Sequence, residues 1–345
     1  RNAAASTVSP VSAMNDWPVG MSVTCGICTG CHEASSVAGR VEAIAYAWPM
    51  DRRCLIAGCG YVGRRLAERM RPAWQVVALA RSPGSVAALR TAGIETIDAD
   101  LDAPRLPGEL QAAADGAAIA YLAPPQDSGT NDTRLARFLD ALGEARPTVF
   151  LYMSTTGVYG DAAGATVDES SPTEPSNDRS RRRVAAEQLT RAWCDVRGLR
   201  WVILRVPGIY GPHRLPLERL KRGEPALEPA AAGPGNRIHV DDLVTACVAA
   251  LERPVSGVFN VGDGDHSSTT AFLQVTAELA GLPAPELVTL AEARGRVSPG
   301  MLGYLVESRR VETGRMRDGL GVTPRYATVA AGVAASLAEM RAQGH

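Results

Sequence analysis

The sequence predicts an α/β protein with a doubly wound parallel sheet and a smaller C-terminal domain. Two patterns predict the sheet: from Arg53 onward short apolar runs alternate with amphipathic stretches, and a glycine-rich turn follows the first apolar run. The chain has 345 residues, of which 46% are hydrophobic, and this is enough to fill one large core or two moderate ones. We therefore expect parallel strands buried under helices on both faces.

Seven short apolar runs have the length and composition of buried strands. They are residues 54–57, 75–80, 94–98, 117–122, 148–154, 199–205 and 257–261. Because parallel strands need long crossover connections, we expect the stretches between these runs to contain helices.

Three of the expected helices can be placed from the sequence. In residues 62–71, apolar side chains recur at helical spacing and Pro72 follows the segment. Residues 178–196 carry a second apolar set at helical spacing, and a third helix is expected over 241–251. Residues 223–236 are rich in Pro, Ala and Gly, and they predict a surface loop at the edge of a cleft.

Composition narrows the function classes. The formal net charge is −1, from 36 basic and 37 acidic residues, so neither nucleic acid nor an anionic membrane is implied as a partner. No apolar run approaches the roughly 18 to 20 residues of a spanning helix, and the first residues do not read as a secretory signal, so we expect a cytoplasmic protein. Four cysteines are scattered through apolar stretches and predict reduced, buried thiols: Cys54, Cys59, Cys194 and Cys247.

Residues 1–49 differ from the rest because they show weak hydrophobic periodicity. They contain a cluster of Cys25, Cys28, Cys31 and His32 that matches C-x-x-C-H. A haem site would need a second axial ligand in an exported domain, and a zinc or iron–sulfur site would need a fourth ligand. We expect a disordered or wrongly assigned extension, with a metal-binding module as the alternative, and a working domain that begins near Met50.

A glycine turn opens that working domain. Gly58, Gly60 and Gly63 follow the first strand and begin the first helix, with Tyr61 and Val62 between them. In this setting the first glycine permits the turn, the second lets the backbone approach a pyrophosphate, and the third lets helix and strand pack closely. Free N–H groups and the helix dipole favour the negative charge. The sequence thus predicts a Rossmann fold that binds NAD(P); a turn without ligand is the alternative.

The end of the second strand distinguishes the two cofactors. An acidic residue there would bind the ribose hydroxyls and exclude a 2′-phosphate, but this chain has Arg81 followed by Ser82. A guanidinium and a hydroxyl suit a phosphate, so NADP is favoured over NAD, unless Arg81 is simply solvated. Four further residues are assigned to the cofactor, of which the first two are candidates to meet the adenine: Asp100, Leu101, Ala123 and Pro124.

Further motifs keep the order of a known family. They are Ser-Thr-Thr-Gly-Val-Tyr-Gly at 154–160, the segment ending in Tyr-Gly-Pro at 204–212, Arg-Ile-His-Val-Asp-Asp at 237–242, and 257–262. From Arg53 onward the chain resembles the extended short-chain dehydrogenase/reductase superfamily, and within it the NAD-dependent epimerase/dehydratase family. The resemblance implies an NAD(P)-binding domain over 50–205, completed by 237–262. It also implies a substrate domain from 206–236 and 263–345, and a homodimer.

The chain departs from this family at the catalytic residues. Catalytic members carry a tyrosine four residues before a lysine and a glutamate four residues after it. With Glu187 as the anchor, Arg183 takes the lysine position and Arg179 the tyrosine position. An arginine stays protonated and is a poor proton shuttle. Thr155 matches the family's catalytic serine or threonine.

Two roles remain open for the arginines. Arg179 and Arg183 share one helix face, so they either form an anion pocket or belong to a solvated basic helix start. Four side chains that the resemblance places near the cleft are candidates to replace the missing tyrosine as general acid: Tyr159, Tyr210, His213 and His239. Of these, Tyr159 is assigned to the catalytic set, and His239 is expected to be structural.

The leading hypothesis is an atypical oxidoreductase or epimerase that transfers hydride to or from a sugar nucleotide or another small hydroxyl or carbonyl compound. The alternative is a catalytically silent NAD(P)-binding sensor or interaction protein, which the missing tyrosine and lysine favour. A haem-dependent redox protein is a distant third possibility.

Overall fold

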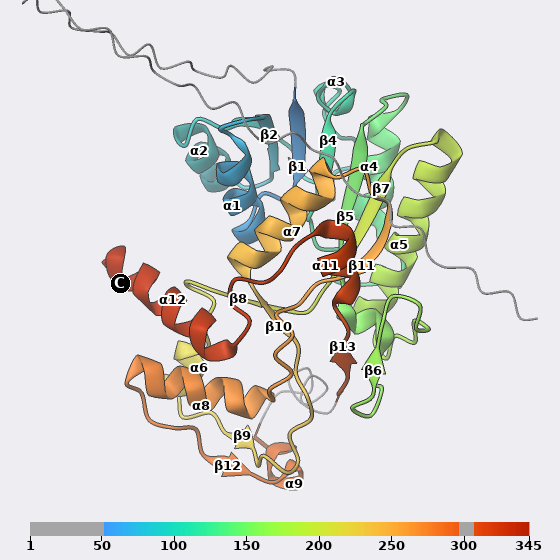
Figure 1. Cartoon of the computed structure of the whole chain (residues 1–345). Helices are drawn as coiled ribbons and strands as arrows, with labels where there is room; N and C mark the ends of the chain where they lie inside the picture. The colour runs from blue at the N-terminus through green and yellow to red at the C-terminus, as the bar shows by residue number, and fades with distance from the viewer. Residues whose placement is uncertain (1–51, 297–306, 345) are drawn as a thin grey trace, which may run out of the picture. The chain divides into compact units, whose positions relative to one another are not determined.

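A seven-stranded parallel sheet forms the centre of the computed structural model, which describes residues 52–296 and 307–344 (Figure 1). The strand order is β11-β7-β5-β4-β1-β2-β3. The strands are β1 (Arg53–Ala57), β2 (Gln75–Ala80), β3 (Glu95–Asp98), β4 (Ala118–Tyr121), β5 (Val149–Thr155), β7 (Trp201–Val206) and β11 (Gly257–Asn260). Each bound lies within two residues of the bound expected from the sequence. The predicted doubly wound parallel sheet is confirmed.

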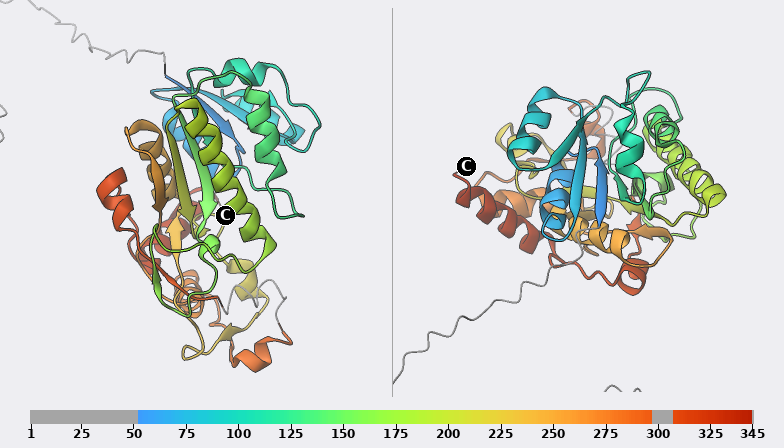
Figure 2. Two further views of the ribbon diagram at one scale, coloured as in Figure 1. Left: turned by 90° about the vertical axis from the view of Figure 1, so that its right-hand side faces the viewer. Right: turned by 90° about the horizontal axis from the view of Figure 1, so that it is seen from above.

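Helices cover both faces of the sheet (Figure 2). One face is covered by α1 (Tyr61–Met70), α2 (Pro83–Thr91), α7 (Val240–Glu252) and α11 (Gly314–Leu320). The other face is covered by α3 (Glu109–Ala114), α4 (Thr133–Leu142) and α5 (Asp178–Arg197). The three helices placed from the sequence are confirmed, with each bound within one residue.

Strand β1 shows why the run of apolar residues is continuous. Cys54 and Ile56 point into the core under α1 and α7, while Leu55 and Ala57 point into the core under α3 and α4. Successive side chains of a strand face opposite ways, so a strand covered on both sides must be apolar at every position.

The strand order also positions the functional site. After β3 the chain crosses to β4 on the other side of β1, so the direction of winding reverses between β1 and β4. In open α/β sheets ligands bind at such a switch point, outside the carboxyl ends of the strands.

Smaller elements occur in the chain after β5 and flank the sheet. Three two-stranded ladders join β8 (Gly208–Tyr210) to β10 (Arg237–His239), β9 (Ala226–Leu227) to β12 (Leu287–Val288), and β6 (Thr166–Val167) to β13 (Arg310–Val311). The remaining described helices are the 3₁₀ turn η1 (Thr156–Tyr159), α6 (Leu217–Lys221), α8 (Thr269–Ala280), α9 (Leu290–Ala293) and α12 (Val329–Ala342).

The surface loop expected over 223–236 is wrong in part. Residues Ala226 and Leu227 are each 2% exposed and pair with Leu287 and Val288. A partner so distant in the chain leaves no local signal, because the pairing depends on how the intervening segments fold.

The expectations for the N-terminal segment lie outside the described residues. These are the extension over 1–49 and any ligand binding by Cys25, Cys28, Cys31 and His32. In the described part of the chain, no helix is long and apolar enough to cross a membrane.

Candidate functional site

A cavity of about 550 Å³ opens at the switch point, at the carboxyl ends of β1, β2 and β4. Its volume lies in the range of small-molecule and cofactor pockets. All the residues that the sequence assigned to a cofactor line it: Gly58, Gly60, Tyr61, Val62, Gly63, Arg81, Ser82, Asp100, Leu101, Ala123 and Pro124. The fold thus brings the predicted set together, and its ligand stays a prediction.

The three glycines of the turn have different surroundings. Gly58 has a φ of +90°, and a Cβ there would lie 2.5 Å from the backbone nitrogen of Ala123. A Cβ at Gly63 would lie 2.8 Å from the carbonyl oxygen of Gly58. At Gly60 an added Cβ would meet no atom within 4 Å. Packing within the chain therefore requires glycine at 58 and 63. The space next to the Cα of Gly60, in contrast, is open for another molecule.

The start of α1 faces this open space without a cap. Among residues 52–296 and 307–344, no side chain is found to accept a hydrogen bond from its first turn, and that turn holds no acidic residue. The first N–H groups of a helix have no partner inside the helix and carry partial positive charge. A phosphate group fits this arrangement.

The end of β2 offers a second cationic position. Arg81 has a side chain that is 64% exposed, and its guanidinium lies 3.7 Å from a carboxylate oxygen of Asp102 and 4.0 Å from one of Asp100. Arg134 binds Asp102 more closely, with nitrogen–oxygen distances of 2.8 and 2.5 Å, and these hydrogen bonds lower the pKa of Asp102. Asp102 is thus neutralised mainly by Arg134, which leaves Arg81 with only loose ion pairs.

Ser82 begins the helix beside Arg81. Its hydroxyl caps α2 by accepting the N–H of Ser85 at 3.2 Å, and it donates to the Ser85 hydroxyl at 2.8 Å. Both serines line the cavity. A guanidinium, two hydroxyls and a helix start therefore gather at one end of the cavity.

The opposite end is formed by residues from β5, α5 and β8: Met153, Arg183 and Ile209. Arg214 also lines the cavity, beside the Tyr61 ring at the start of α1. Arg183 is the one predicted catalytic residue in the cavity lining. Its Nη1 donates to the Met153 carbonyl oxygen at 2.8 Å and to the Tyr152 hydroxyl at 3.1 Å. Strand β5 thus fixes a permanent positive charge at this end.

The other predicted catalytic residues are not part of the lining. Thr155 ends β5, and its hydroxyl accepts the N–H of Gly157 at 3.1 Å. Arg179 is exposed in the first turn of α5. Tyr159 is 4% exposed, and its hydroxyl donates to Oδ1 of Asn260 at 2.7 Å.

Tyr159 belongs to a buried polar network. The Arg205 guanidinium lies 4.8 Å from the centre of the Tyr159 ring and binds the Glu187 carboxylate at 2.8 and 3.1 Å. Glu187 also accepts the Ser154 hydroxyl at 2.6 Å. Burial raises the pKa of Tyr159, so its hydroxyl stays neutral. These contacts join α5 to the ends of β5, β7 and β11.

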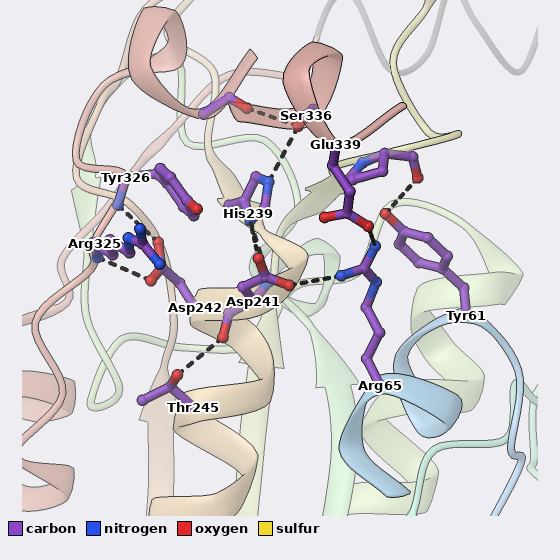
Figure 3. Close-up of polar contacts among 12 residues, drawn as sticks. Tyr61, Arg65, His239, Asp241, Asp242, Thr245, Arg325, Tyr326, Ser336 and Glu339 are labelled. Atoms are coloured by element: carbon purple, nitrogen blue, oxygen red, sulfur yellow. Dashed lines mark hydrogen bonds and ion pairs between the residues drawn. The ribbon is translucent and has the colours of Figure 1, made fainter. Parts of the chain in front are cut away.

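His239 lies in a separate polar network that joins α1, α7 and α12 (Figure 3). It is 1% exposed, and its Nε2 lies 3.1 Å from the Ser336 hydroxyl. Burial lowers the pKa of the imidazole. Arg65 joins the same elements, because it binds both Asp241 at 2.9 Å and Glu339 at 2.5 Å. These contacts agree with the structural role expected for His239.

Several lining residues were missed in the sequence: Cys59, Leu79, Ala80, Ser85, Ala99, Leu122, Arg134, Met153, Ile209 and Arg214. Ser85 had a local signal, since it lies three residues after the serine that caps α2. Arg134 and Arg214 had none, because they come from segments far from the glycine turn and belong to no motif.

Comparison with known proteins gives a family match. The model of the NAD dependent epimerase/dehydratase family matches residues 54–262. The dTDP-D-glucose 4,6-dehydratase of Bos taurus is 30% identical over 153 residues, which cover 42% of this chain and 42% of that enzyme. The chain thus matches less than half the length of that curated relative.

Solved structures match over most of the chain. A functionally unknown conserved protein from Silicibacter pomeroyi DSS is 32% identical, with a TM-score of 0.72 over 84% of this chain and 99% of that one. MoeE5 in complex with UDP-glucose and NAD is 24% identical, with a TM-score of 0.67 over 85% of this chain and 100% of that one. The latter likeness concerns the fold alone.

Proposed function

Because this chain belongs to the NAD dependent epimerase/dehydratase family, we propose that it binds NADP(H) in the cavity and acts as an oxidoreductase or epimerase. Its substrate is a sugar nucleotide or another small hydroxyl or carbonyl compound. The observation that carries the proposal is the open space before Gly60, at the uncapped start of α1, within a cavity lined by all the predicted cofactor residues. A bound dinucleotide supplies a nicotinamide that accepts or gives hydride.

The chain's residues fit the parts of the cofactor in order. The first-turn N–H groups of α1 would bind the pyrophosphate, and Asp100 and Leu101, which line the cavity just after β3, would contact the adenine. Arg81, Ser82 and the start of α2 receive the 2′-phosphate, which is the reason for preferring NADP to NAD. MoeE5, which shares the fold, is seen in complex with UDP-glucose and NAD.

At the other end, Arg183 orients the reactants with a fixed positive charge. Its bonds to β5 use Nη1, and no hydrogen bond of Nε or Nη2 to a described residue is found. Those N–H groups are thus available to a ribose hydroxyl or to a substrate oxygen. Arg183 cannot move a proton, so a reaction at this end needs its proton from water or from the substrate itself.

A second candidate function is that of a catalytically silent sensor of the cofactor. It is favoured by the pKa values of two titratable side chains that line the cavity. Tyr61 and Cys59 are the tyrosine and cysteine of the described lining. Burial raises the pKa of Tyr61 to about 12 and that of Cys59 to about 11. Neither is matched to proton exchange near neutral pH.

Calorimetric titration of the full chain with NADPH and NADH tests the cofactor assignment. We expect NADPH to bind at least about 10-fold more tightly, and Arg81→Ala to remove this preference while NADH binding is unchanged. Arg69→Ala is a matched control, because Arg69 is exposed on α1 and does not line the cavity. Equal affinity for the two cofactors would refute the NADP preference, and binding of neither would refute both candidate functions.

Deuterium transfer separates the enzyme from the sensor. NADP⁺ is incubated with the protein and a panel of sugar nucleotides deuterated at their hydroxyl-bearing ring carbons, including UDP-glucose and dTDP-glucose, because these sugars can only give hydride to an oxidised cofactor. NADPH labelled at the reactive ring carbon is incubated with carbonyl-bearing sugar nucleotides, which can accept hydride. Movement of the label between cofactor and sugar, or from one carbon of the sugar to another, establishes an enzyme. Tight binding of NADPH with no transfer to any compound of the panel favours the sensor.

A further inference from the structure

A turn that follows β8 is locked against the start of α1. The Tyr61 hydroxyl donates to the carbonyl oxygen of Pro212 at 2.8 Å. At the preceding residue, Gly211, an added Cβ would lie 2.6 Å from that hydroxyl. The turn closes on itself, since the N–H of Arg214 donates to the Gly211 carbonyl at 3.0 Å. Two segments far apart in sequence therefore meet at the first residue of α1.

The backbone of this turn is strained at the residue before Arg214. His213 has a φ of +61°. This left-handed conformation costs free energy for any residue other than glycine. The Nε2 of His213 lies 2.9 Å from Oε1 of Gln343, next to the end of α12. The turn is held from two sides in a conformation that brings the Arg214 side chain into the cavity lining.

Two guanidinium groups flank the Tyr61 ring, and their electrostatic environments differ. Arg65 lies 5.7 Å from the ring centre and is neutralised by Asp241 and Glu339 (Figure 3). Arg214 lies 4.7 Å from the ring centre. Within residues 52–296 and 307–344, no ion pair of Arg214 and no hydrogen bond of its side chain is found. One of the two cations is therefore uncompensated, and it is the one that lines the cavity.

The position of this charge matches the pyrophosphate of the proposed cofactor. Tyr61 begins α1, whose first-turn N–H groups lie beside the open space at Gly60. The helix start supplies only about half a positive charge, whereas a pyrophosphate carries about two negative charges. A guanidinium binds phosphate oxygens through two N–H groups at once and supplies a full charge.

We propose that Arg214 binds the cofactor pyrophosphate together with the first turn of α1. The turn at Gly211–Arg214 then acts as a clamp brought to the cofactor by the segment that follows the sheet. This inference rests on the proposed binding of NADP(H) in the same cavity. It assigns a binding role to a residue that no motif of the chain marks.

Three ligands separate the pyrophosphate from the rest of the cofactor. They are NADPH, 2′-phospho-ADP-ribose, which keeps the pyrophosphate without the nicotinamide, and adenosine 2′-monophosphate, which lacks the pyrophosphate. The variant Arg214→Met keeps an apolar stem over the Tyr61 ring and removes the charge. We expect it to bind the first two ligands about 10-fold to 100-fold more weakly and adenosine 2′-monophosphate as the wild type does.

The controls distinguish the possible failures. Arg214→Lys should recover part of the affinity. Arg222→Ala should change nothing, because Arg222 is exposed at the end of α6 and does not line the cavity. Unchanged binding of 2′-phospho-ADP-ribose by Arg214→Met would overturn this inference alone. An equal loss for all three ligands would also overturn it. If the wild type bound none of them, the proposed function itself would fail.

Discussion

The two ends of the cavity are built in different ways. At the glycine turn the surface is backbone: Gly58, Gly60 and Gly63 open α1, whose first N–H groups have no side-chain cap. At the other end the surface is made of side chains from β5, α5 and β8. The first end is formed by three glycines in a short motif. The second end forms only when segments distant in sequence come together in the tertiary structure.

The difference extends to the polar groups behind each end. At the glycine turn the N–H groups of α1 are still available to a ligand. Behind the other end, Glu187, Arg205 and Tyr159 bind one another or Asn260 and are nearly buried. Tyr159, which the sequence assigned to the catalytic set, therefore belongs to a buried network, and Arg183 is the predicted catalytic residue that lines the cavity.

The largest expected effect is on the buried pair behind the second end. Glu187→Ala leaves the Arg205 charge buried without a counter-ion, because both groups are less than 5% exposed. We expect the free energy of unfolding to fall by about 3 to 5 kcal/mol in urea titrations. The double variant Glu187→Leu with Arg205→Leu should recover most of that loss. A loss below about 1 kcal/mol for Glu187→Ala would show that this network does not hold the strand ends.

The next effect separates two glycines of one turn. Gly58→Ala should lower the free energy of unfolding by about 3 kcal/mol, because φ is +90° and the new Cβ would contact the backbone of Ala123. Gly60→Ala should cost no more than about 1 kcal/mol, because its Cβ would meet no atom of a described residue within 4 Å. It should nevertheless weaken NADPH binding at least about 10-fold, since the methyl group occupies the phosphate position.

Urea unfolding and NADPH calorimetry on both variants check this contrast. Gly108→Ala is the control, since an added Cβ there meets no atom within 4 Å and Gly108 does not line the cavity. Unimpaired NADPH binding by Gly60→Ala would mean that the pyrophosphate does not approach the turn. The glycine turn would then not be the phosphate-binding end of the cavity.

A smaller effect tests Tyr159. Tyr159→Phe removes the hydrogen bond to Asn260 but keeps the ring beneath Arg205, so we expect a loss of about 1 kcal/mol in unfolding free energy. NADPH affinity and any hydride transfer should stay as in the wild type, because the residue does not line the cavity. Loss of turnover at unchanged stability would restore the catalytic role that the sequence suggested.

The smallest effect concerns pH. Burial raises the pKa of Cys59 to about 11 and that of Tyr61 to about 12, so both stay protonated and neutral below those values. Between about pH 7 and about pH 9, NADPH affinity should change less than about twofold in calorimetric titrations. An inflection within that interval would reveal a titrating group at the glycine turn that these two pKa values do not provide.

Local patterns determined much of this protein from the sequence alone. The apolar runs predicted every strand of the sheet, because a strand covered on both faces must be apolar throughout. The glycine turn predicted where the cavity lies, because its backbone geometry is set by residues adjacent in sequence. The arginine and serine after the second strand gave the candidate phosphate position for the same reason.

Only the tertiary structure decided which distant side chains reach the cavity and which are used for packing. Arg214 contacts Tyr61 because a turn after β8 folds back onto α1. Tyr159 does not line the cavity, and its hydroxyl binds Asn260 instead. Residues 226–227 were expected in a surface loop and instead form β9, which pairs with β12 about sixty residues later in the chain. Such contacts depend on chain segments that meet only after the sheet has formed, so no periodicity or local motif records them.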